Sequence, residues 1–195
     1  MSLSAVLLAG GESRRMRCDK ATVEWRGRPL WKWQIEKLRA ARPEKIFVSA
    51  RSDPLWRPPD VELILDMPPS RGPLSGLAAT LGAIETGHLL ALAIDMPLMT
   101  IEHLQLLCSR AASGTGVIPM IDGKAEPLAA IYPKEARAIF VEKLQGDNFS
   151  VQPVVRSLID LKLLRAMSIS GPSREFYRSI NEPRDLDRLT ETYRS

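Results

Sequence analysis

The fold of this chain is decided near its N-terminus, in the stretch Ala5-Val6-Leu7-Leu8-Ala9-Gly10-Gly11-Glu12-Ser13-Arg14-Arg15-Met16-Arg17-Cys18-Asp19-Lys20. The stretch opens with five consecutive apolar residues, a pattern typical of a strand buried in a sheet. Two glycines then end the strand, and because glycine has no Cβ, a ligand can approach their main-chain N–H groups. Four cations follow within the next nine residues. The strand, the glycine turn and the cations together favour a polyphosphate site over an ordinary strand-to-loop connection.

This glycine turn belongs to neither of the two most familiar phosphate-binding loops. No Gly-Lys-Ser/Thr follows the glycines, which excludes a Walker loop. The spacing Gly-x-Gly-x-x-Gly of dinucleotide-binding folds is also missing from this stretch.

Length and composition are those of one α/β domain covering residues 1–195. Hydrophobic residues make up 45% of the chain and charged residues 26%, values ordinary for a globular protein. No apolar run reaches the length of a membrane span, and the first one lacks the basic region that precedes a signal sequence. We therefore expect a cytoplasmic protein with no membrane partner.

Charge and aromatic content argue against a nucleic-acid partner. The net charge of +4 favours anionic ligands in general but is modest for a nucleic-acid binder. Aromatic residues are 6% of the chain and are not interleaved with basic ones as in single-strand binders. The two cysteines are too few for a cysteine metal cluster.

Hydrophobic periodicity predicts strands alternating with helices. After the first strand, the pattern predicts strands at 46–48, 61–65, 89–94, 117–121, 127–132 and, weakly, 161–169. It predicts helices at 29–41, 73–85, 101–112, 133–145 and 150–159, a loop at 171–175, and a last helix from Asn181. Pro119 should place its strand at an edge or a bulge, and Pro153 should interrupt its helix.

This order of elements predicts a three-layer α/β/α, Rossmann-like architecture, with a mostly parallel sheet between two helical layers. Asp122-Gly123 is a hairpin signal, so the segment 117–132 should add an antiparallel pair and make the sheet mixed.

Several polar features should meet at one edge of that sheet. The Gly10-Gly11 turn, Asp66 and Asp95 all follow predicted strands, and the helix start at Gly72-Pro73 lies on the same side. A cation-rich loop facing a carboxylate is suited to a metal–nucleotide complex.

Two of these residues have a plain structural alternative. Asp95 would otherwise cap the next helix, but Thr100 is the better N-cap and does not need it. Gly76, in the first turn of its helix, is explained equally well by loose packing or by the close approach of a ligand ring.

The glycine-rich stretch resembles the signature loop of the molybdenum cofactor guanylyltransferases, the MobA family of nucleotidyltransferases. The shared pattern is Leu8-Ala9-Gly10-Gly11-x-Ser13-x-Arg15-Met16-x-x-Asp19-Lys20, with Arg17 where the family has glycine. Four further motifs are similar to the family in the same order: Gly72-Pro73-Leu74-Ser75-Gly76, Asp95-Met96-Pro97, Glu126-Pro127-Leu128-Ala129-Ala130-Ile131-Tyr132 and Ile180-Asn181-Glu182-Pro183-x-Asp185-Leu186. The resemblance spans residues 5–186 and implies the nucleotidyltransferase version of the fold.

The resemblance also implies roles for individual residues. Catalytic positions fall at Arg15, Lys20 and Asp95, Asp95 would bind Mg²⁺, and Asn181 would face the acceptor. Nucleotide-binding positions fall at Leu8, Ala9, Gly10, Gly11, Lys20, Ser49, Asp66, Gly76 and Asp95, with Ser49 replacing the more usual asparagine.

The implied reaction is transfer of GMP from GTP to the terminal phosphate of the molybdenum–molybdopterin cofactor, with release of pyrophosphate. Mg²⁺ is the implied cofactor, GTP and the molybdopterin cofactor are the implied substrates, and cofactor-delivery proteins or molybdoenzymes are further candidate partners. An ionised phosphate nucleophile needs no general base, which agrees with the absence of histidine from the predicted site.

Other functions stay open at this point. A cytidylyltransferase for the same cofactor or a sugar-phosphate nucleotidyltransferase would share the fold, although such relatives usually read Leu-Ala-Ala-Gly where this chain has Leu8-Ala9-Gly10-Gly11. A non-catalytic nucleotide-binding relative is kept open by Arg17 and Ser49. A nucleic-acid module using the cluster from Arg14 to Lys20 is a third class.

Overall fold

The computed structural model describes residues 2–10, 19–66, 70–181 and 185. Ten strands occur in these residues: β1 Leu3–Leu8, β2 Glu24–Trp25, β3 Arg28–Pro29, β4 Lys45–Ala50, β5 Glu62–Leu65, β6 His88–Ala93, β7 Gly116–Ile121, β8 Lys124–Ala125, β9 Ala129–Pro133 and β10 Leu164–Ser168. The α-helices are α1 Leu30–Ala40, α2 Pro73–Ala83, α3 Ile101–Arg110, α4 Arg137–Leu144 and α5 Val151–Asp160. Shorter 3₁₀ helices span Lys20–Thr22, Lys134–Ala136 and Gly171–Tyr177.

The main sheet has the order β10-β7-β9-β6-β1-β4-β5, with β8 paired to the end of β7. Strand β1 lies parallel to β4 and β6, β4 lies parallel to β5, and β7 lies parallel to β10. Strand β9 is antiparallel to both of its neighbours, β6 and β7. The sheet is therefore mixed and mostly parallel, as predicted.

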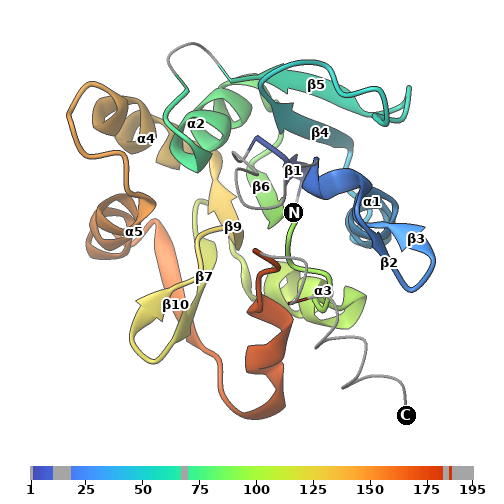
Figure 1. Ribbon diagram of the computed structural model, residues 1–195. Coiled ribbons are helices and arrows are strands. Elements are labelled where there is room, and N and C mark those ends of the chain that lie inside the picture. Colours follow the sequence, from blue (N-terminus) through green and yellow to red (C-terminus); the bar gives the residue numbers. More distant parts are fainter. Residues whose placement is uncertain (1, 11–18, 67–69, 182–184, 186–195) are drawn as a thin grey trace.

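Helices cover both faces of this sheet. Alternate residues of β1 point to opposite sides: Leu7 joins the core with α1 and α3, whereas Val6 joins the core with α2, α4 and α5. Figure 1 shows α2, α4 and α5 on one side of the sheet and α1 and α3 on the other. The three-layer α/β/α prediction is confirmed.

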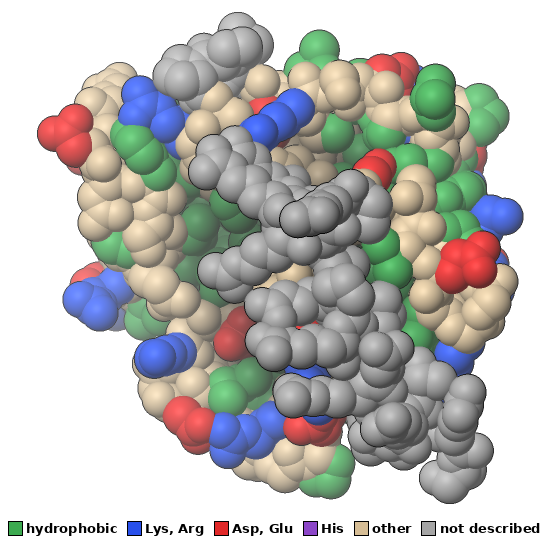
Figure 2. All heavy atoms as spheres, in the orientation of Figure 1, with side chains coloured by type: hydrophobic (Ala, Val, Ile, Leu, Met, Phe, Trp, Pro, Cys, Tyr) green, Lys and Arg blue, Asp and Glu red, His purple; other side chains and the backbone are tan. Residues whose placement is uncertain are grey.

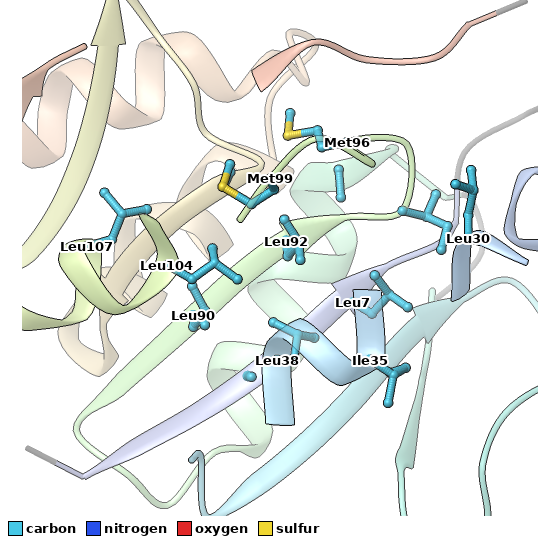
Figure 3. Close-up of a cluster of buried hydrophobic side chains, with 14 of the residues drawn as sticks. Leu7, Leu30, Ile35, Leu38, Leu90, Leu92, Met96, Met99, Leu104 and Leu107 are labelled. Carbon is cyan, nitrogen blue, oxygen red and sulfur yellow. The ribbon is translucent and has the colours of Figure 1, made fainter. Parts of the chain in front are cut away.

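The core between the sheet and α1 and α3 is built almost entirely from aliphatic and methionine side chains. Figure 3 shows Leu30 and Leu38 of α1 facing Leu7 and Leu92 of the sheet. All four of these side chains are fully buried. Parallel strands covered on both faces read as continuous apolar runs, which is why β1 and β6 were recognisable from sequence.

The strand containing Pro119 was predicted to lie at an edge or to be bulged, and the edge position is wrong. Strand β7 lies inside the sheet, paired with β10 along its length. On its other side it pairs with β9 only at Val117 and with β8 from Met120 onward. Pro119 has no N–H to donate. It lies between the part of β7 that pairs with β9 and the part that pairs with β8, so no hydrogen bond of either ladder is lost.

Pro153 does not interrupt its helix either. Helix α5 runs continuously from Val151, with Ser150 as its N-cap. Pro153 lies in the first turn, where the backbone N–H groups have no intrahelical acceptor in any helix.

Two further segments differ from the prediction in detail. The returning strand of the hairpin is split into β8 and β9, although Asp122 and Gly123 do form the turn, both with positive φ. The segment expected as a loop at 171–175 is part of the 3₁₀ helix Gly171–Tyr177. Apart from Asp185, the predicted last helix lies outside the described residues beyond Asn181.

The exterior shows no segregation of charge on the face drawn in Figure 2, where basic and acidic side chains alternate around the periphery. Exposed ion pairs of the described residues include Arg39 with Asp60 and Lys45 with Glu62. None of the helices in the described residues combines the length and the apolarity needed to cross a lipid bilayer.

Candidate functional site

A cavity opens at the carboxyl edge of the sheet, where β1, β4 and β6 end. Its lining comes from segments far apart in sequence: Leu8, Ala9, Gly10, Lys20, Ser49, Asp66, Gly72, Pro73, Ala93, Ile94, Asp95 and Leu128. Gly10, the two aspartates and the start of α2 therefore meet at one edge, as the sequence predicted.

Backbone hydrogen bonds continue the parallel ladders beyond the ends of the strands. Ala9 N donates to Ser49 O at 2.9 Å, and Asp66 N donates to Ala50 O at 2.9 Å. On the other side of β1, Ile94 N donates to Leu8 O at 3.1 Å. These bonds hold the first residues of three loops beside one another at the floor of the cavity.

Two candidate nucleotide-binding residues, Ser49 and Asp66, bind each other. Ser49 Oγ donates to Asp66 Oδ1 at 2.9 Å, and both residues are nearly inaccessible to solvent. Asp66 Oδ2 accepts a longer bond of 3.3 Å from Ser70 Oγ. A carboxylate has lone pairs for further donors, so these bonds orient Asp66 without exhausting it.

This pair explains two glycines. A Cβ on Gly10 would lie 2.5 Å from Asp66 Oδ2, and a Cβ on Gly76 would collide with Ser49 Oγ. Gly76 lies in α2 behind Ser49 and is not among the described residues that line the cavity. Close packing against the Ser49–Asp66 pair is thus a third explanation for Gly76, which sequence reasoning did not consider.

Lys20, Asp95 and Asn181 come together at the rim of the cavity. Lys20 Nζ lies 3.1 Å from Asp95 Oδ2 and 3.2 Å from Asn181 Oδ1. The Lys20 and Asp95 side chains are 17% and 20% exposed, so both can be reached from solvent. Thr100 caps α3 by accepting from His103 N, so Asp95 has no capping role there.

The segment that carries Asn181 is held by a buried polar cluster. His103 Nε2 and the Tyr177 hydroxyl lie 2.6 Å apart and join α3 to the 3₁₀ helix before Asn181. Burial lowers the pKa of His103, and burial together with the nearby charge of Glu126 raises the pKa of Tyr177. Neither residue lines the cavity, and their effect is to fix the path of the chain to Ile180, whose N–H donates to Asp95 O at 2.8 Å.

The residues present fit a magnesium ion bound together with a nucleotide. Mg²⁺ is usually held by one or two carboxylates, with water and substrate phosphates completing the shell. Asp95 offers a partly exposed carboxylate at the rim, with Lys20 on one of its two oxygens. The described residues contain no cluster of three or more metal-binding side chains, so a complete protein cage is not formed there.

Sequence reasoning missed some of the residues at this site. Leu128, from the link between β8 and β9, lines the cavity, although its motif was recognised. Next to the cavity, Asp19 Oδ1 accepts from Ala21 N at 2.9 Å and Asp19 Oδ2 accepts from Trp56 Nε1 at 2.7 Å. Trp56 in turn stacks on Trp31 of α1. No local signal in the proline-rich segment around Trp56 indicated this contact. Gly11 and Arg15, two predicted site residues, lie outside the described residues.

The sequence matches a known protein family and relatives within it. A family model described as the MobA-like NTP transferase domain matches residues 5–162. A probable molybdenum cofactor guanylyltransferase of Opitutus terrae is 33% identical over 190 residues, covering 96% of this chain and 94% of that protein.

Solved structures share the fold. Molybdopterin-guanine dinucleotide biosynthesis protein A of Archaeoglobus fulgidus superposes with a TM-score of 0.73 at 24% identity, covering 97% of each chain. The 2-C-methyl-D-erythritol 4-phosphate cytidylyltransferase of Thermus thermophilus superposes with a TM-score of 0.66 at 14% identity, covering 97% of this chain and 98% of that one. At these identities the likeness establishes the fold alone, and it is the family match over most of the chain that identifies this protein as a member of the MobA-like NTP transferase family.

Proposed function

We propose that this protein transfers GMP from GTP to the terminal phosphate of the molybdenum–molybdopterin cofactor, releasing pyrophosphate and forming the guanine dinucleotide cofactor. The observation that carries the proposal is the meeting of Lys20, Asp95 and Asn181 at the rim of a cavity lined by the end of β1. A relative named as a molybdenum cofactor guanylyltransferase, 33% identical over nearly the whole chain, supports the choice of substrates. The whole chain 1–195 acts as one nucleotidyltransferase domain, in the cytoplasm.

In this proposal the nucleotide occupies the cavity. Its phosphates are contacted by Lys20, with Arg15 and the backbone at Gly10 and Gly11 as further contacts. Ala9 N–H already donates to Ser49 O, so a contact from Ala9 uses its carbonyl oxygen. Leu8 packs against the nucleotide from the end of β1.

The base and ribose lie toward Ser49 and Asp66. Gly76 acts from behind them, because any larger residue there would push Ser49 toward the ligand. The acceptor approaches from the side of Asn181.

The chemistry is a displacement at phosphorus. An oxygen of the acceptor phosphate attacks the α-phosphorus of GTP, a new P–O bond forms, and the bond to the β-phosphate breaks, so that pyrophosphate leaves with the electron pair. The nucleophile is already ionised, so no proton has to be removed. Bringing two anions together is the main barrier, and Lys20 and Arg15 lower it by offsetting charge on the phosphates. Asp95 would hold Mg²⁺, which when bound polarises the phosphate oxygens.

The test is pyrophosphate release from purified protein with Mg²⁺, the molybdopterin cofactor and each of GTP, CTP, ATP and UTP in turn. GTP should give acceptor-dependent release, and mass spectrometry should find the guanine dinucleotide cofactor. Faster release with CTP would identify a cytidylyltransferase instead. Tight GTP binding without release would identify a non-catalytic nucleotide-binding protein.

The release of product is expected to involve other proteins. Cofactor-delivery proteins or molybdoenzymes are the proposed partners, because the dinucleotide cofactor is consumed by insertion into an enzyme. Co-purification of the loaded protein with an apo-molybdoenzyme would test this step.

A further inference from the structure

The segment that carries Asp95 has no regular secondary structure beyond its first residue, yet four of its five carbonyls accept hydrogen bonds of 3.0 Å or shorter. The segment runs from Ala93, the last residue of β6, to Pro97. Asp95 O accepts from Ile180 N at 2.8 Å. The carbonyls of Ala93, Met96 and Pro97 accept from two side chains of one helix, α1, and that of Ile94 has a longer contact with the same helix.

Gln34 supplies most of these bonds. Its Nε2 lies 3.0 Å from Ala93 O and 2.9 Å from Met96 O, with a longer contact of 3.5 Å to Ile94 O. The Gln34 side chain is completely buried. Because an amide nitrogen has two hydrogens, the two short bonds use its full donor capacity.

Lys37 completes the arrangement. It lies one turn further along α1, on the same face as Gln34. Lys37 Nζ donates to Pro97 O at 2.7 Å and to Gln34 Oε1 at 2.9 Å. The second bond fixes which way the Gln34 amide points, since Oε1 must face the lysine and Nε2 must face the carbonyls.

Burying these two polar side chains costs folding free energy. Lys37 is only 7% exposed, and burial lowers its pKa to about 7. Leucines at both positions would add apolar contacts to a core that already holds Leu30 and Leu38 (Figure 3). A polar pair at this place therefore needs an explanation beyond packing, and its bonds all end on the segment that carries Asp95.

We propose that Gln34 and Lys37 are positioning residues that set the backbone of the Ala93–Pro97 segment and thereby the direction of the Asp95 side chain. The inference rests on the proposed function of Asp95 in nucleotidyl transfer. Met96 of this segment and Met99 just beyond it are buried in the same core as Leu30 and Leu38 of α1 (Figure 3), so the segment is held by apolar contacts and by directed hydrogen bonds together.

The test replaces each residue by methionine, which has nearly the same length and no donor. The matched control is Thr86→Val, because Thr86 is also buried and its hydroxyl, with one hydrogen, lies 2.9 Å from Ser4 Oγ and 3.0 Å from the acceptor His88 O, at the opposite end of β6. Gln34→Met should lower kcat at least tenfold and leave the KM for GTP within about twofold, because the side chain of Gln34 hydrogen-bonds the backbone of the Ala93–Pro97 segment, and the lining residues at the ends of β1 and β4 are held by their own backbone bonds. Thr86→Val should keep kcat within twofold of the wild type, even if its melting temperature falls as far as that of Gln34→Met.

A second readout needs no catalysis. In hydrogen exchange on the ligand-free protein, the amides of Met99 and Ile180, which donate into the segment, should exchange at least tenfold faster in Gln34→Met. The amides of Leu90 and Leu92 in β6 should stay protected, and Thr86→Val should leave Met99 and Ile180 unchanged.

The two readouts separate the possible failures. Unchanged exchange in Gln34→Met overturns the inference, and so does faster exchange with kcat within twofold of the wild type. If the wild-type protein releases no pyrophosphate from GTP, the proposed function fails, and exchange alone decides whether Gln34 sets the segment. If Gln34→Met does not fold, Lys37→Met, which removes a single bond to the segment, is judged by the same criteria.

Discussion

The ammonium group of Lys20 lies 3.1 Å from Oδ2 of Asp95, although 75 positions separate the two residues in the chain. The pair joins the cation proposed to contact the phosphates to the carboxylate proposed to hold the metal. Each charge of the pair therefore partly neutralises the other, and a ligand meets both together. Variants of one must be read together with variants of the other.

We expect Asp95→Asn to fold normally and to lose turnover. The side chain keeps its shape, its oxygen can still accept from Lys20, and Lys20 also reaches Asn181 Oδ1, so we expect the free energy of unfolding to change little. An amide is a poor ligand for a hard cation, so turnover should fall on the order of a hundredfold, equivalent to about 3 kcal/mol of transition-state stabilisation. Melting temperature without ligand and Mg²⁺-dependent pyrophosphate release are measured on one preparation. A variant that melts much earlier would make Asp95 structural, and one that turns over normally would remove it from the site.

Lys20→Met should weaken GTP binding about tenfold, or about 1.4 kcal/mol, because one phosphate contact is lost. Lys20→Arg should recover part of the affinity, since the charge is kept. The control is Lys45→Met, which removes an equal charge at the start of β4, where Lys45 pairs with Glu62 at the start of β5, whereas the cavity lies at the ends of these strands. Calorimetric titration with GTP at two salt concentrations checks all three. Equal loss in the Lys20 and Lys45 variants would mean that only net charge matters.

GTP should bind at least tenfold tighter than CTP, a gap of about 1.4 kcal/mol. Guanine has neighbouring N–H groups that can donate hydrogen bonds to a carboxylate. Asp66 is a buried carboxylate that lines the cavity. Asp66→Asn should therefore reduce the ratio of GTP to CTP affinity more than it reduces CTP binding itself. Thermal stabilisation by each nucleotide gives the comparison. Equal or reversed affinities in the wild-type protein would contradict the choice of guanine.

Gly76→Ala should destabilise the fold by about 1–2 kcal/mol, although alanine favours a helix by about 1 kcal/mol over glycine. The new Cβ would collide with Ser49 Oγ and break its bond to Asp66. In a Ser49→Ala background the same change should cost about 1 kcal/mol less, because the hydroxyl is gone. Urea unfolding of the four proteins in this cycle measures the coupling. Additive effects would show that the Ser49 hydroxyl is not what requires glycine here.

The buried Lys37 predicts a dependence of stability on pH. Burial lowers its pKa from 10.5 to about 7, so between these values the unfolded chain holds a proton that the folded chain has lost. The unfolded state then binds more protons, and the free energy of unfolding rises with pH across this window by up to about 1.4 kcal/mol per pH unit. Below pH 7 both states are protonated and this contribution is at its lowest.

Lys37→Met removes this titration and serves as the reference. The difference in unfolding free energy between wild type and variant should shift toward the wild type by about 2 kcal/mol between pH 7 and pH 9. Urea unfolding at the two pH values provides the measurement. A difference that stays constant with pH would show that Lys37 keeps an ordinary pKa in the folded protein.

Local sequence patterns were sufficient to predict the buried strands and the amphipathic helices. Continuous apolar runs identified β1 and β6, and helical spacing identified α1 and α3. Asp66 and Asp95 could be placed at one edge because parallel strands end on the same side of a sheet. The edge position expected from Pro119 and the interruption expected at Pro153 were wrong because the effect of a proline depends on which N–H its position would have used. For Pro119 this depends on the strands that pair with β7, and for Pro153 it depends on where α5 begins.

The sequence by itself determined the layered fold, the edge at which the site lies and the family, because these follow from periodicity and from ordered motifs. Only the tertiary structure decided which side chains meet. The contact of Lys20 with Asn181, the packing of Gly76 against Ser49 and the bonds from Gln34 to Met96 each join residues from separate elements. Such contacts depend on how helices and loops settle on the sheet, to within a fraction of an ångström, and no local pattern encodes that distance.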